Sequence, residues 1–205
     1  MKSLFFITHQ TEKFDYLQSV KIALQGGCKQ IQLRMKDALV IEIEKTAIKA
    51  KALCDEYGSD LYINDYAEVC LYVKAAGVHL GKTDMSPVEA RLLLGNNYMI
   101  GGTANTFDDI YQLYKQGIDY IGLGPFRHTK TKKKLSPILG LDGYRRILDL
   151  CRQHEINLPI FAIGGITIND IPVIMQTGVS GVALSSTILN AENPVEETKN
   201  IIQKI

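Results

Sequence analysis

Short apolar segments alternate with longer amphipathic segments along the whole chain. The apolar segments are rich in Val, Ile, Leu and aromatic residues, and they have the length of strands. Near-continuous apolar character is typical of strands that are buried on both faces of a parallel sheet. The pattern predicts strands at Leu4–Thr8, Gln30–Met35, Asp60–Asn64, Gly77–Leu80, Tyr98–Thr103, Tyr120–Gly124, Pro159–Gly164 and Gly181–Ser185.

The segments between these strands show the spacing of amphipathic helices. Apolar residues recur with a period near 3.6 in Asp15–Leu24, Ala38–Tyr57 and Asp108–Gln116. Many helices end at a glycine in the left-handed conformation, and a glycine follows most of the helical stretches here. The candidates for this position are Gly26, Gly27, Gly58, Gly77, Gly95, Gly117 and Gly178.

Eight strand–helix units in succession predict an α/β fold with an all-parallel sheet. Eight is the number that closes a (β/α)8 TIM barrel, although about 250 residues is usual for that fold and this chain has 205. A doubly wound open sheet is the alternative. No linker or change of composition divides the chain, so we predict a single compact barrel domain over residues 1–205.

The composition is that of an ordinary globular protein. Hydrophobic residues make up 46%, charged residues 22%, and the formal net charge is +1. This near-neutral charge gives no reason to expect nucleic acid or a membrane surface as a partner. No apolar run approaches the roughly 20 residues of a membrane span, and the apolar N-terminus is too short for a signal peptide. The four cysteines lack zinc and disulfide spacing, which favours reduced thiols in the cytoplasm.

One strand end carries an unusual run of polar side chains. Gln32, Arg34 and Lys36 occupy positions i, i+2 and i+4, which on a strand places them on one face. Leu33 and Met35 then point to the other face. An amide and two cations are costly to bury without partners. We therefore expect this face to meet either water or a polyanion.

Polar residues also follow the other predicted strands. In a TIM barrel the active site lies at the carboxyl ends of the strands, so these residues are predicted to converge on one rim. They are Asn64 and Asp65, Lys82–Asp84, Thr103, the basic segment 127–134, Gly164 and Gly165, and Ser185 and Ser186.

Asp65 and Asp84 are carboxylates at the ends of neighbouring predicted strands. Mg²⁺ takes one or two carboxylates and fills its other positions with water and phosphate, so the pair suits this metal. Helix capping is the alternative, because each aspartate stands shortly before a helical stretch.

Two further segments suit anions. Thr129–Lys134 contains four lysines and two threonines, and with Arg127 and His128 it forms either a flap that closes on phosphate or a solvated loop. The loops after strands seven and eight form the usual phosphate site of a TIM barrel, and here they contain Gly164-Gly165 and Ser185-Ser186. Two anion sites and a metal suit one substrate with a diphosphate and another with one phosphate.

Six segments, in order, resemble the thiamine-phosphate synthase family. They are 32–36 (QLRMK), 63–65 (IND), 77–81 (GVHLG), 124–125 (GP) together with 129–132 (TKTK), 162–166 (AIGGI) and 181–183 (GVA). The resemblance implies a TIM-barrel transferase that joins hydroxymethylpyrimidine diphosphate to thiazole phosphate, giving thiamine phosphate and pyrophosphate.

The resemblance also implies a role for each candidate residue. Arg34, Lys36 and Lys132 would neutralise the leaving diphosphate as the catalytic residues, while Asp65 and Asp84 would bind Mg²⁺. Thr103 stands where the family usually has serine. The implied substrate-binding residues are Gln32, Arg34, Lys36, Asn64 and Lys132 for the pyrimidine diphosphate, and Thr129, Thr131, Gly165 and Ser186 for the thiazole phosphate. Thr103 and Ser185 are also implied to bind substrate.

Two other functions fit the same family. One is a thiazole tautomerase-like isomerase, and the other is a non-catalytic regulator that binds thiazole phosphate. Some tautomerases use a histidine just after the fifth strand, where this chain has Thr103-Ala104-Asn105. His9 stands where the family often has aspartate, and His79 is either a contact for the thiazole or a structural residue. A homo-oligomer is compatible with the sequence, which does not set the oligomeric state.

Overall fold

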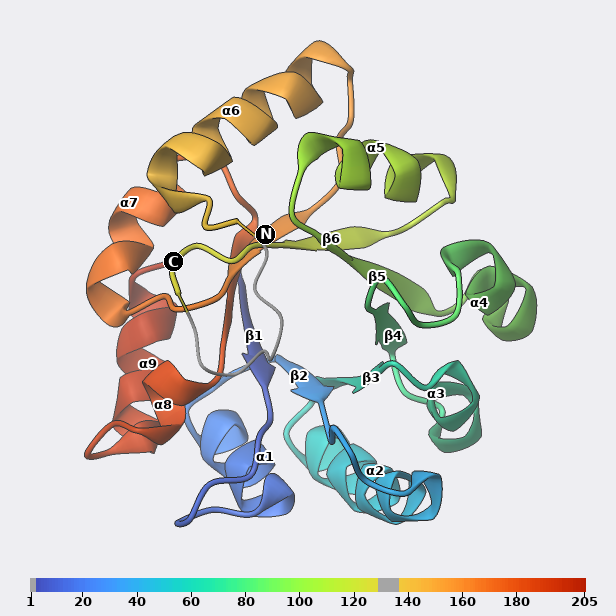
Figure 1. Cartoon of the computed structure of the whole chain (residues 1–205). Coiled ribbons are helices and arrows are strands. Elements are labelled where there is room, and N and C mark those ends of the chain that lie inside the picture. The colour runs from blue at the N-terminus through green and yellow to red at the C-terminus, as the bar shows by residue number, and fades with distance from the viewer. Residues whose placement is uncertain (1–2, 129–136) are drawn as a thin grey trace.

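Eight parallel strands form a closed barrel in which each strand pairs with its neighbours in chain order, and β1 pairs with β8 (Figure 1). This computed structural model describes residues 3–128 and 137–205. The closed barrel confirms the predicted TIM-barrel class and rules out an open doubly wound sheet. The strands are β1 Ser3–Ile7, β2 Gln30–Leu33, β3 Asp60–Asn64, β4 Gly77–Leu80, β5 Met99–Ala104, β6 Tyr120–Leu123, β7 Ile160–Ile163 and β8 Gly181–Leu184.

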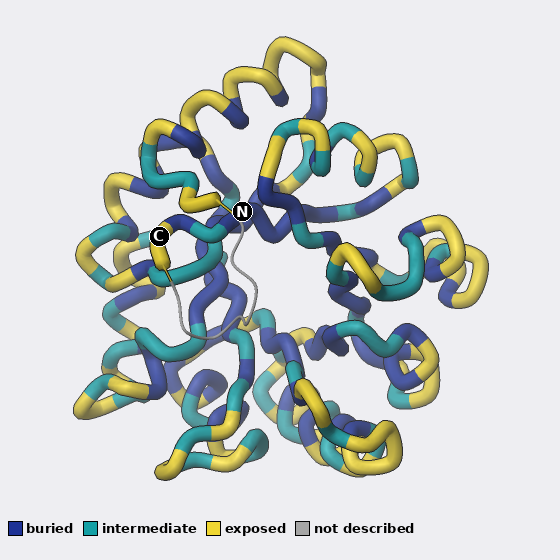
Figure 2. The backbone as a smooth tube through the Cα atoms, in the orientation of Figure 1, coloured by how far each residue is buried: buried dark blue, intermediate teal, exposed yellow. Residues whose placement is uncertain are grey.

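Helices follow the strands and surround the barrel (Figure 1). Their inner faces are buried against the strands, whereas the exposed positions lie on the outside of the ring (Figure 2). The helices are α1 Tyr16–Gln25, α2 Val40–Glu56, α3 Ala67–Val73, α4 Pro87–Leu94, α5 Phe107–Lys115, α6 Gly140–Gln153, the 3₁₀ helix η1 Ile168–Asp170, α7 Ile171–Met175, α8 Ser186–Leu189 and α9 Pro194–Gln203.

The predicted strand boundaries are wrong by one or two residues at several ends. The difference that matters is β2, which ends at Leu33, so Arg34 and Lys36 lie in the loop that follows and not on the strand face. Gly77 begins β4 as the predicted strand Gly77–Leu80 has it, but it is not the left-handed residue that ends the preceding helix, because Lys74 supplies that residue after α3. Both errors concern ends of elements, where local pattern is least informative.

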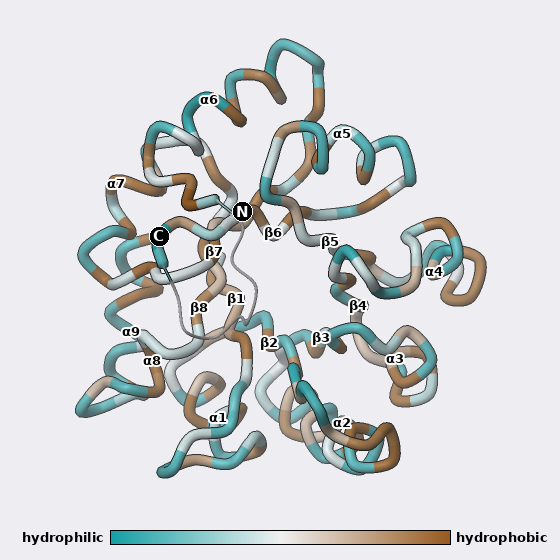
Figure 3. The backbone as a smooth tube through the Cα atoms, in the orientation of Figure 1, coloured by the Kyte–Doolittle hydropathy of each residue, from teal (hydrophilic) through white to brown (hydrophobic). Residues whose placement is uncertain are grey.

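Four aromatic rings fill the interior of the barrel. Phe5 of β1 lies with its ring centroid 4.9 Å from Tyr62, 5.2 Å from Tyr120 and 4.9 Å from Phe161. All four side chains are buried, and Ala183 of β8 completes the cluster. The strands that carry them are largely apolar, whereas hydrophilic positions predominate on the outer helix faces (Figure 3). The interior is therefore a packed core and not an open channel.

Replacing Gly101 with alanine is expected to lower the free energy of unfolding by about 3 kcal/mol, as in severely overpacked cores. The new Cβ would lie 2.0 Å from Cζ of Tyr120, a ring confined by the aromatic cluster. Gly102→Ala is the matched control, because its Cβ would meet flexible methyl groups of Leu113 and Ile118 at 3.0 and 3.1 Å. Urea unfolding measures both variants, and equal losses of stability would contradict this account of the core.

The structure bears on two predictions from the sequence, the one about membrane spans and the one about reduced cysteines. Among residues 3–128 and 137–205, no helix has the length and apolar character needed to cross a membrane. All four cysteines are free and buried. Burial raises the pKa of the Cys28 and Cys54 thiols to about 12, so these groups stay protonated and unreactive at neutral pH.

Candidate active site

A cavity of about 440 Å³ opens at the carboxyl ends of the strands. Ile7, Ile163 and Ala183 line it and also contact or belong to the aromatic cluster, so that cluster closes the barrel beneath the cavity. The sequence-predicted site residues that line it are Gln32, Arg34, Asn64, Thr103, Gly165, Ser185 and Ser186.

Arg34 enters the cavity from the loop after β2. Its backbone N–H donates to Oγ1 of Thr8 at 2.9 Å, which ties this loop to the end of β1. Burial lowers the pKa of the Arg34 guanidinium, and the negative charge of Asp65 only partly opposes that shift. Within the described part of the chain Arg34 forms no ion pair, so a half-buried cation faces the cavity and suits an anionic ligand.

Asp65, Asp84 and Lys36 form a charged group beside the cavity. Nζ of Lys36 forms an ion pair with Oδ2 of Asp65, and the two carboxylates are close enough to hydrogen-bond to each other. Oδ2 of Asp84 also accepts the Gly81 N–H at 2.6 Å. Burial raises the pKa of the Asp65 carboxyl, and the neighbouring Asp84 adds to the shift. A pair of carboxylates in contact is a favourable place for a cation.

The helix-capping alternative for these aspartates is wrong. The N-cap residue of α4 is Ser86, whose hydroxyl accepts from the backbone of Glu89, and Asp84 stands outside that motif. At α3 the N-cap position belongs to Tyr66, and no side chain caps the helix. Asp65 instead has a left-handed backbone, with φ of 71°, which turns its carboxylate toward Lys36.

His79 and Thr103 meet inside the cavity. Nε2 of His79 lies 3.0 Å from Oγ1 of Thr103, and both residues line the cavity next to Asn64. Gly122 makes room for the imidazole, since a Cβ there would lie 3.1 Å from its Cε1. His79 therefore orients the Thr103 hydroxyl, a contact that the sequence had left undecided.

His9 is a cavity residue that the sequence did not assign to the site. Its Nδ1 lies 2.7 Å from Oγ of Ser185, which joins the loop after β1 to the end of β8. Burial lowers the pKa of the imidazole, and the charge of Arg34 lowers it further. The signal available in the sequence was its position directly after the first strand. Lys82, which was predicted to lie on the rim but was given no role, also lines the cavity and forms an ion pair of 2.7 Å with Asp109.

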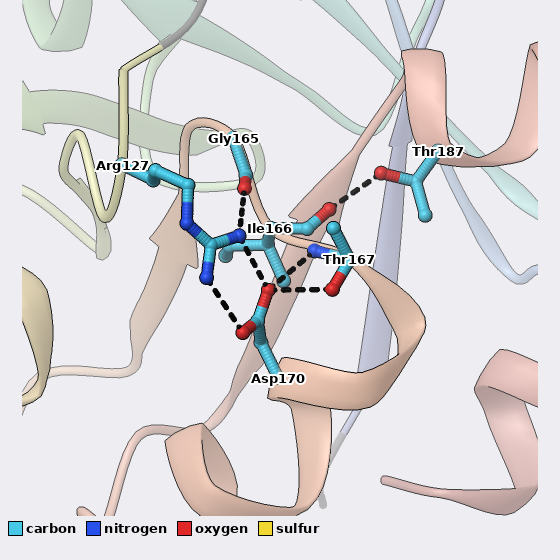
Figure 4. A network of polar contacts seen from close by, with 6 residues as sticks. All are labelled: Arg127, Gly165, Ile166, Thr167, Asp170 and Thr187. Atoms are coloured by element: carbon cyan, nitrogen blue, oxygen red, sulfur yellow. Dashed lines mark hydrogen bonds and ion pairs between the residues drawn. The ribbon is translucent and has the colours of Figure 1, made fainter.

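The basic segment is only partly described. Thr129, Thr131 and Lys132 lie outside the described residues. Arg127, at the start of the segment, does not line the cavity. Arg127 forms an ion pair with Asp170 of η1 (Figure 4). At this position the structure therefore differs from a flap whose cations face phosphate.

The fold and the cavity together define a class. The protein is a TIM barrel with Arg34, Lys82 and the glycine-containing loop after β7 around one cavity at its carboxyl rim, and with a carboxylate pair beside that cavity. A family model described as thiamine monophosphate synthase matches residues 4–188, and the chain belongs to this family.

Individual relatives match this chain over nearly its full length. The chain is 56% identical over 197 residues to thiamine-phosphate synthase of Phocaeicola vulgatus, covering 96% of this chain and 95% of the relative. It is 54% identical over 202 residues to thiamine-phosphate synthase of Bacteroides thetaiotaomicron, covering 98% and 97%. Thiamine phosphate pyrophosphorylase from Pyrococcus furiosus superposes with a TM-score of 0.87 at 30% identity, covering 98% of this chain and 94% of that one.

Proposed function

We propose that this protein joins hydroxymethylpyrimidine diphosphate to thiazole phosphate, giving thiamine phosphate and pyrophosphate. The observation that carries the proposal is that Arg34 lines a cavity whose other side is formed by the loops after β7 and β8, while Lys36, Asp65 and Asp84, which do not line it, form a charged group next to its lining residues Asn64 and Gly81. Family membership supplies the identity of the two substrates.

The diphosphate binds at the β2–β3 side in this proposal. Arg34 presents a guanidinium that no described carboxylate neutralises, and Gln32 and Asn64 present buried amides beside it. Lys36 adds a second cation at the rim. These groups stabilise the negative charge that grows on the diphosphate as it leaves, which is electrostatic catalysis by preorganised donors. Lys132 is proposed for the same role and lies outside the described residues.

Asp65 and Asp84 are the residues that would hold Mg²⁺. Their mutual contact and the raised pKa of Asp65 support a cation between or beside them. Mg²⁺ is commonly held by one or two carboxylates together with water and phosphate oxygens, which two aspartates beside a diphosphate would provide. When bound, Mg²⁺ supplies positive charge to the diphosphate oxygens.

The reaction needs no nucleophile from the protein. The bond between the pyrimidine methylene carbon and the diphosphate oxygen breaks, and both electrons leave with the diphosphate. The lone pair of the thiazole nitrogen then forms the new C–N bond. Thr103, held by His79, contacts the pyrimidine from the β5 side, and Gly165, Ser185 and Ser186 hold the thiazole phosphate with Thr129 and Thr131.

The isomerase and regulator alternatives are less well supported. Relatives more than half identical to this chain carry the synthase name. Neither alternative requires a carboxylate pair beside a diphosphate site. We also propose a cytoplasmic location, because four free, buried thiols suit a reducing compartment.

The test is a direct assay of purified protein with both substrates. We expect pyrophosphate and thiamine phosphate in equal amounts, no product when either substrate is omitted, loss of turnover with a chelator, and recovery on adding Mg²⁺. Binding of thiazole phosphate without pyrophosphate release would reject the synthase proposal in favour of the isomerase or the regulator. Full turnover in the presence of the chelator would reject the proposal that the reaction requires Mg²⁺.

A further inference from the structure

Three carbonyl groups of the loop after β7 accept hydrogen bonds from Arg127, in the loop after β6, and from Thr187 of α8; the contacts of Gly165 and Ile166 are drawn in Figure 4. The backbone N–H of Arg127 donates to the Gly164 carbonyl at 2.9 Å, and Nη1 of the same arginine donates to the Gly165 carbonyl at 3.0 Å. Oγ1 of Thr187 donates to the Ile166 carbonyl at 2.5 Å. These contacts fix the orientation of successive peptide groups in the loop.

Fixing a carbonyl also fixes the N–H of the same peptide group. In a trans peptide the two point in opposite directions, so the N–H groups of Gly165 and Ile166 point away from Arg127. Gly165 and Ile166 line the cavity whereas Arg127 does not, which places these N–H groups on the cavity side. In the described part of the chain neither N–H has an acceptor, so both are available to an anion.

Arg127 is itself rigidly held. Its Nη1 and Nη2 donate to the two carboxylate oxygens of Asp170, each at 2.8 Å, in the bidentate arrangement that guanidinium and carboxylate favour. Asp170 also accepts from the N–H and the hydroxyl of Thr167, at 2.8 and 2.7 Å. The hydrogen bonds from Arg127 lower the pKa of Asp170 to about 2, so the pair stays ionised at neutral pH.

Asp170 thus neutralises the positive charge of Arg127. Arg127 contributes to the site by holding the loop after β7 in place and not by its charge. Gly165 lets the two loops approach, because a Cβ there would lie 2.8 Å from the His128 carbonyl and 3.0 Å from Cβ of Arg127. We propose that Arg127 and Asp170 are positioning residues that aim the Gly165 and Ile166 N–H groups at the phosphate of the thiazole substrate. This inference rests on the proposed function and assigns a role to two residues outside the cavity lining.

Arg127→Gln is the central variant. We expect its KM for thiazole phosphate to rise by about tenfold or more. A rise of this size corresponds to losing one hydrogen bond between a backbone N–H group and the charged phosphate. The KM for the pyrimidine diphosphate and kcat at saturation should stay within about twofold, since the β2–β3 side is untouched. Arg127→Lys keeps the charge but lacks the planar fork, so it should not restore the KM.

Asp170→Asn should raise the same KM, and the double variant should resemble the single ones, because the two residues act as one unit. Arg145→Gln is the matched control, since Arg145 forms an exposed pair with Asp142 on α6 at 3.2 Å. Thermal unfolding of every variant accompanies the kinetics, and calorimetric titration with thiazole phosphate gives affinity without turnover.

The outcomes separate cleanly. A selective rise in KM and dissociation constant for thiazole phosphate supports the positioning role. An unchanged KM, or equal rises for both substrates, overturns it while leaving the synthase function standing. Wild-type protein that binds thiazole phosphate without turnover rejects the synthase, yet the weakened binding of Arg127→Gln would still support the positioning role. Wild-type protein that neither binds nor turns over would overturn both proposals.

Discussion

Replacing Arg34 with alanine is expected to lower kcat/KM by a factor of about 10² to 10³, the usual cost of removing one donor from a preorganised anion site. Arg34 is half-buried, its pKa is lowered by burial, and no described carboxylate forms an ion pair with it. Its charge is therefore directed at the ligand. The interaction with Arg34 becomes stronger as negative charge grows on the leaving diphosphate. Its removal should therefore lower kcat as well as the affinity for the substrate. Steady-state kinetics of pyrophosphate release measure the effect.

Two further variants make this test specific. Arg34→Lys should recover only part of the activity, because an ammonium cannot replace a planar, bidentate guanidinium. Arg146→Ala on the exposed face of α6 removes the same charge far from the cavity and should stay within about twofold of wild type. If Arg34→Ala turned over normally, Arg34 would have no part in catalysis.

Asp65→Asn is expected to lower Mg²⁺-dependent turnover by at least about 10², because an amide supplies no charge to a metal ligand set of only two carboxylates. The apparent affinity for Mg²⁺ should fall together with kcat. Asp60→Asn is the matched control, since Asp60 is exposed at the opposite end of the same strand. Normal Mg²⁺ dependence in Asp65→Asn would exclude this carboxylate as a ligand.

The same variant should not lose stability. Burial and Asp84 raise the pKa of Asp65 above its ordinary value of 3.8, so the ionised form is less favourable in the folded state than in the unfolded one. That cost is absent below pH 3.8, grows as the pH rises from 3.8 to the folded pKa, and is complete above the folded pKa. In a chelator at pH 7, Asp65→Asn should therefore have a melting temperature at or above that of wild type. A clear drop would show that the Lys36 ion pair outweighs the burial of the charge.

Much of the fold could be predicted from the order of apolar segments. Each strand is short, apolar and followed by a helical stretch, and eight such units admit few arrangements other than a closed barrel. The site was predictable for the same reason: carboxyl ends of parallel strands meet at one rim. This rule brought Gln32, Asn64, Thr103 and Ser185 together correctly.

Side-chain partners were not predictable in this way. No local pattern pairs Arg127 with Asp170, which are separated by 43 residues, and the basic segment that contains Arg127 was predicted to be either a phosphate-binding flap or a solvated loop. It also left His9 outside the site, although His9 contacts Ser185 at the closure of the barrel. Both contacts join loops from different strands, and loop conformation depends on neighbours that no local pattern specifies.

By itself, then, the sequence determined the number of strands, their parallel order and the rim at which polar groups gather, because hydrophobic periodicity and strand order act through backbone geometry alone. Only the tertiary structure decided which of those groups touch. Asp65 meets Asp84 and Lys36, His79 orients Thr103, and Arg127 is held by Asp170. Such contacts depend on the closing of the barrel and on the packing of loops that are far apart in the chain. They determine the charge of the side chains at the site and the direction in which those side chains point.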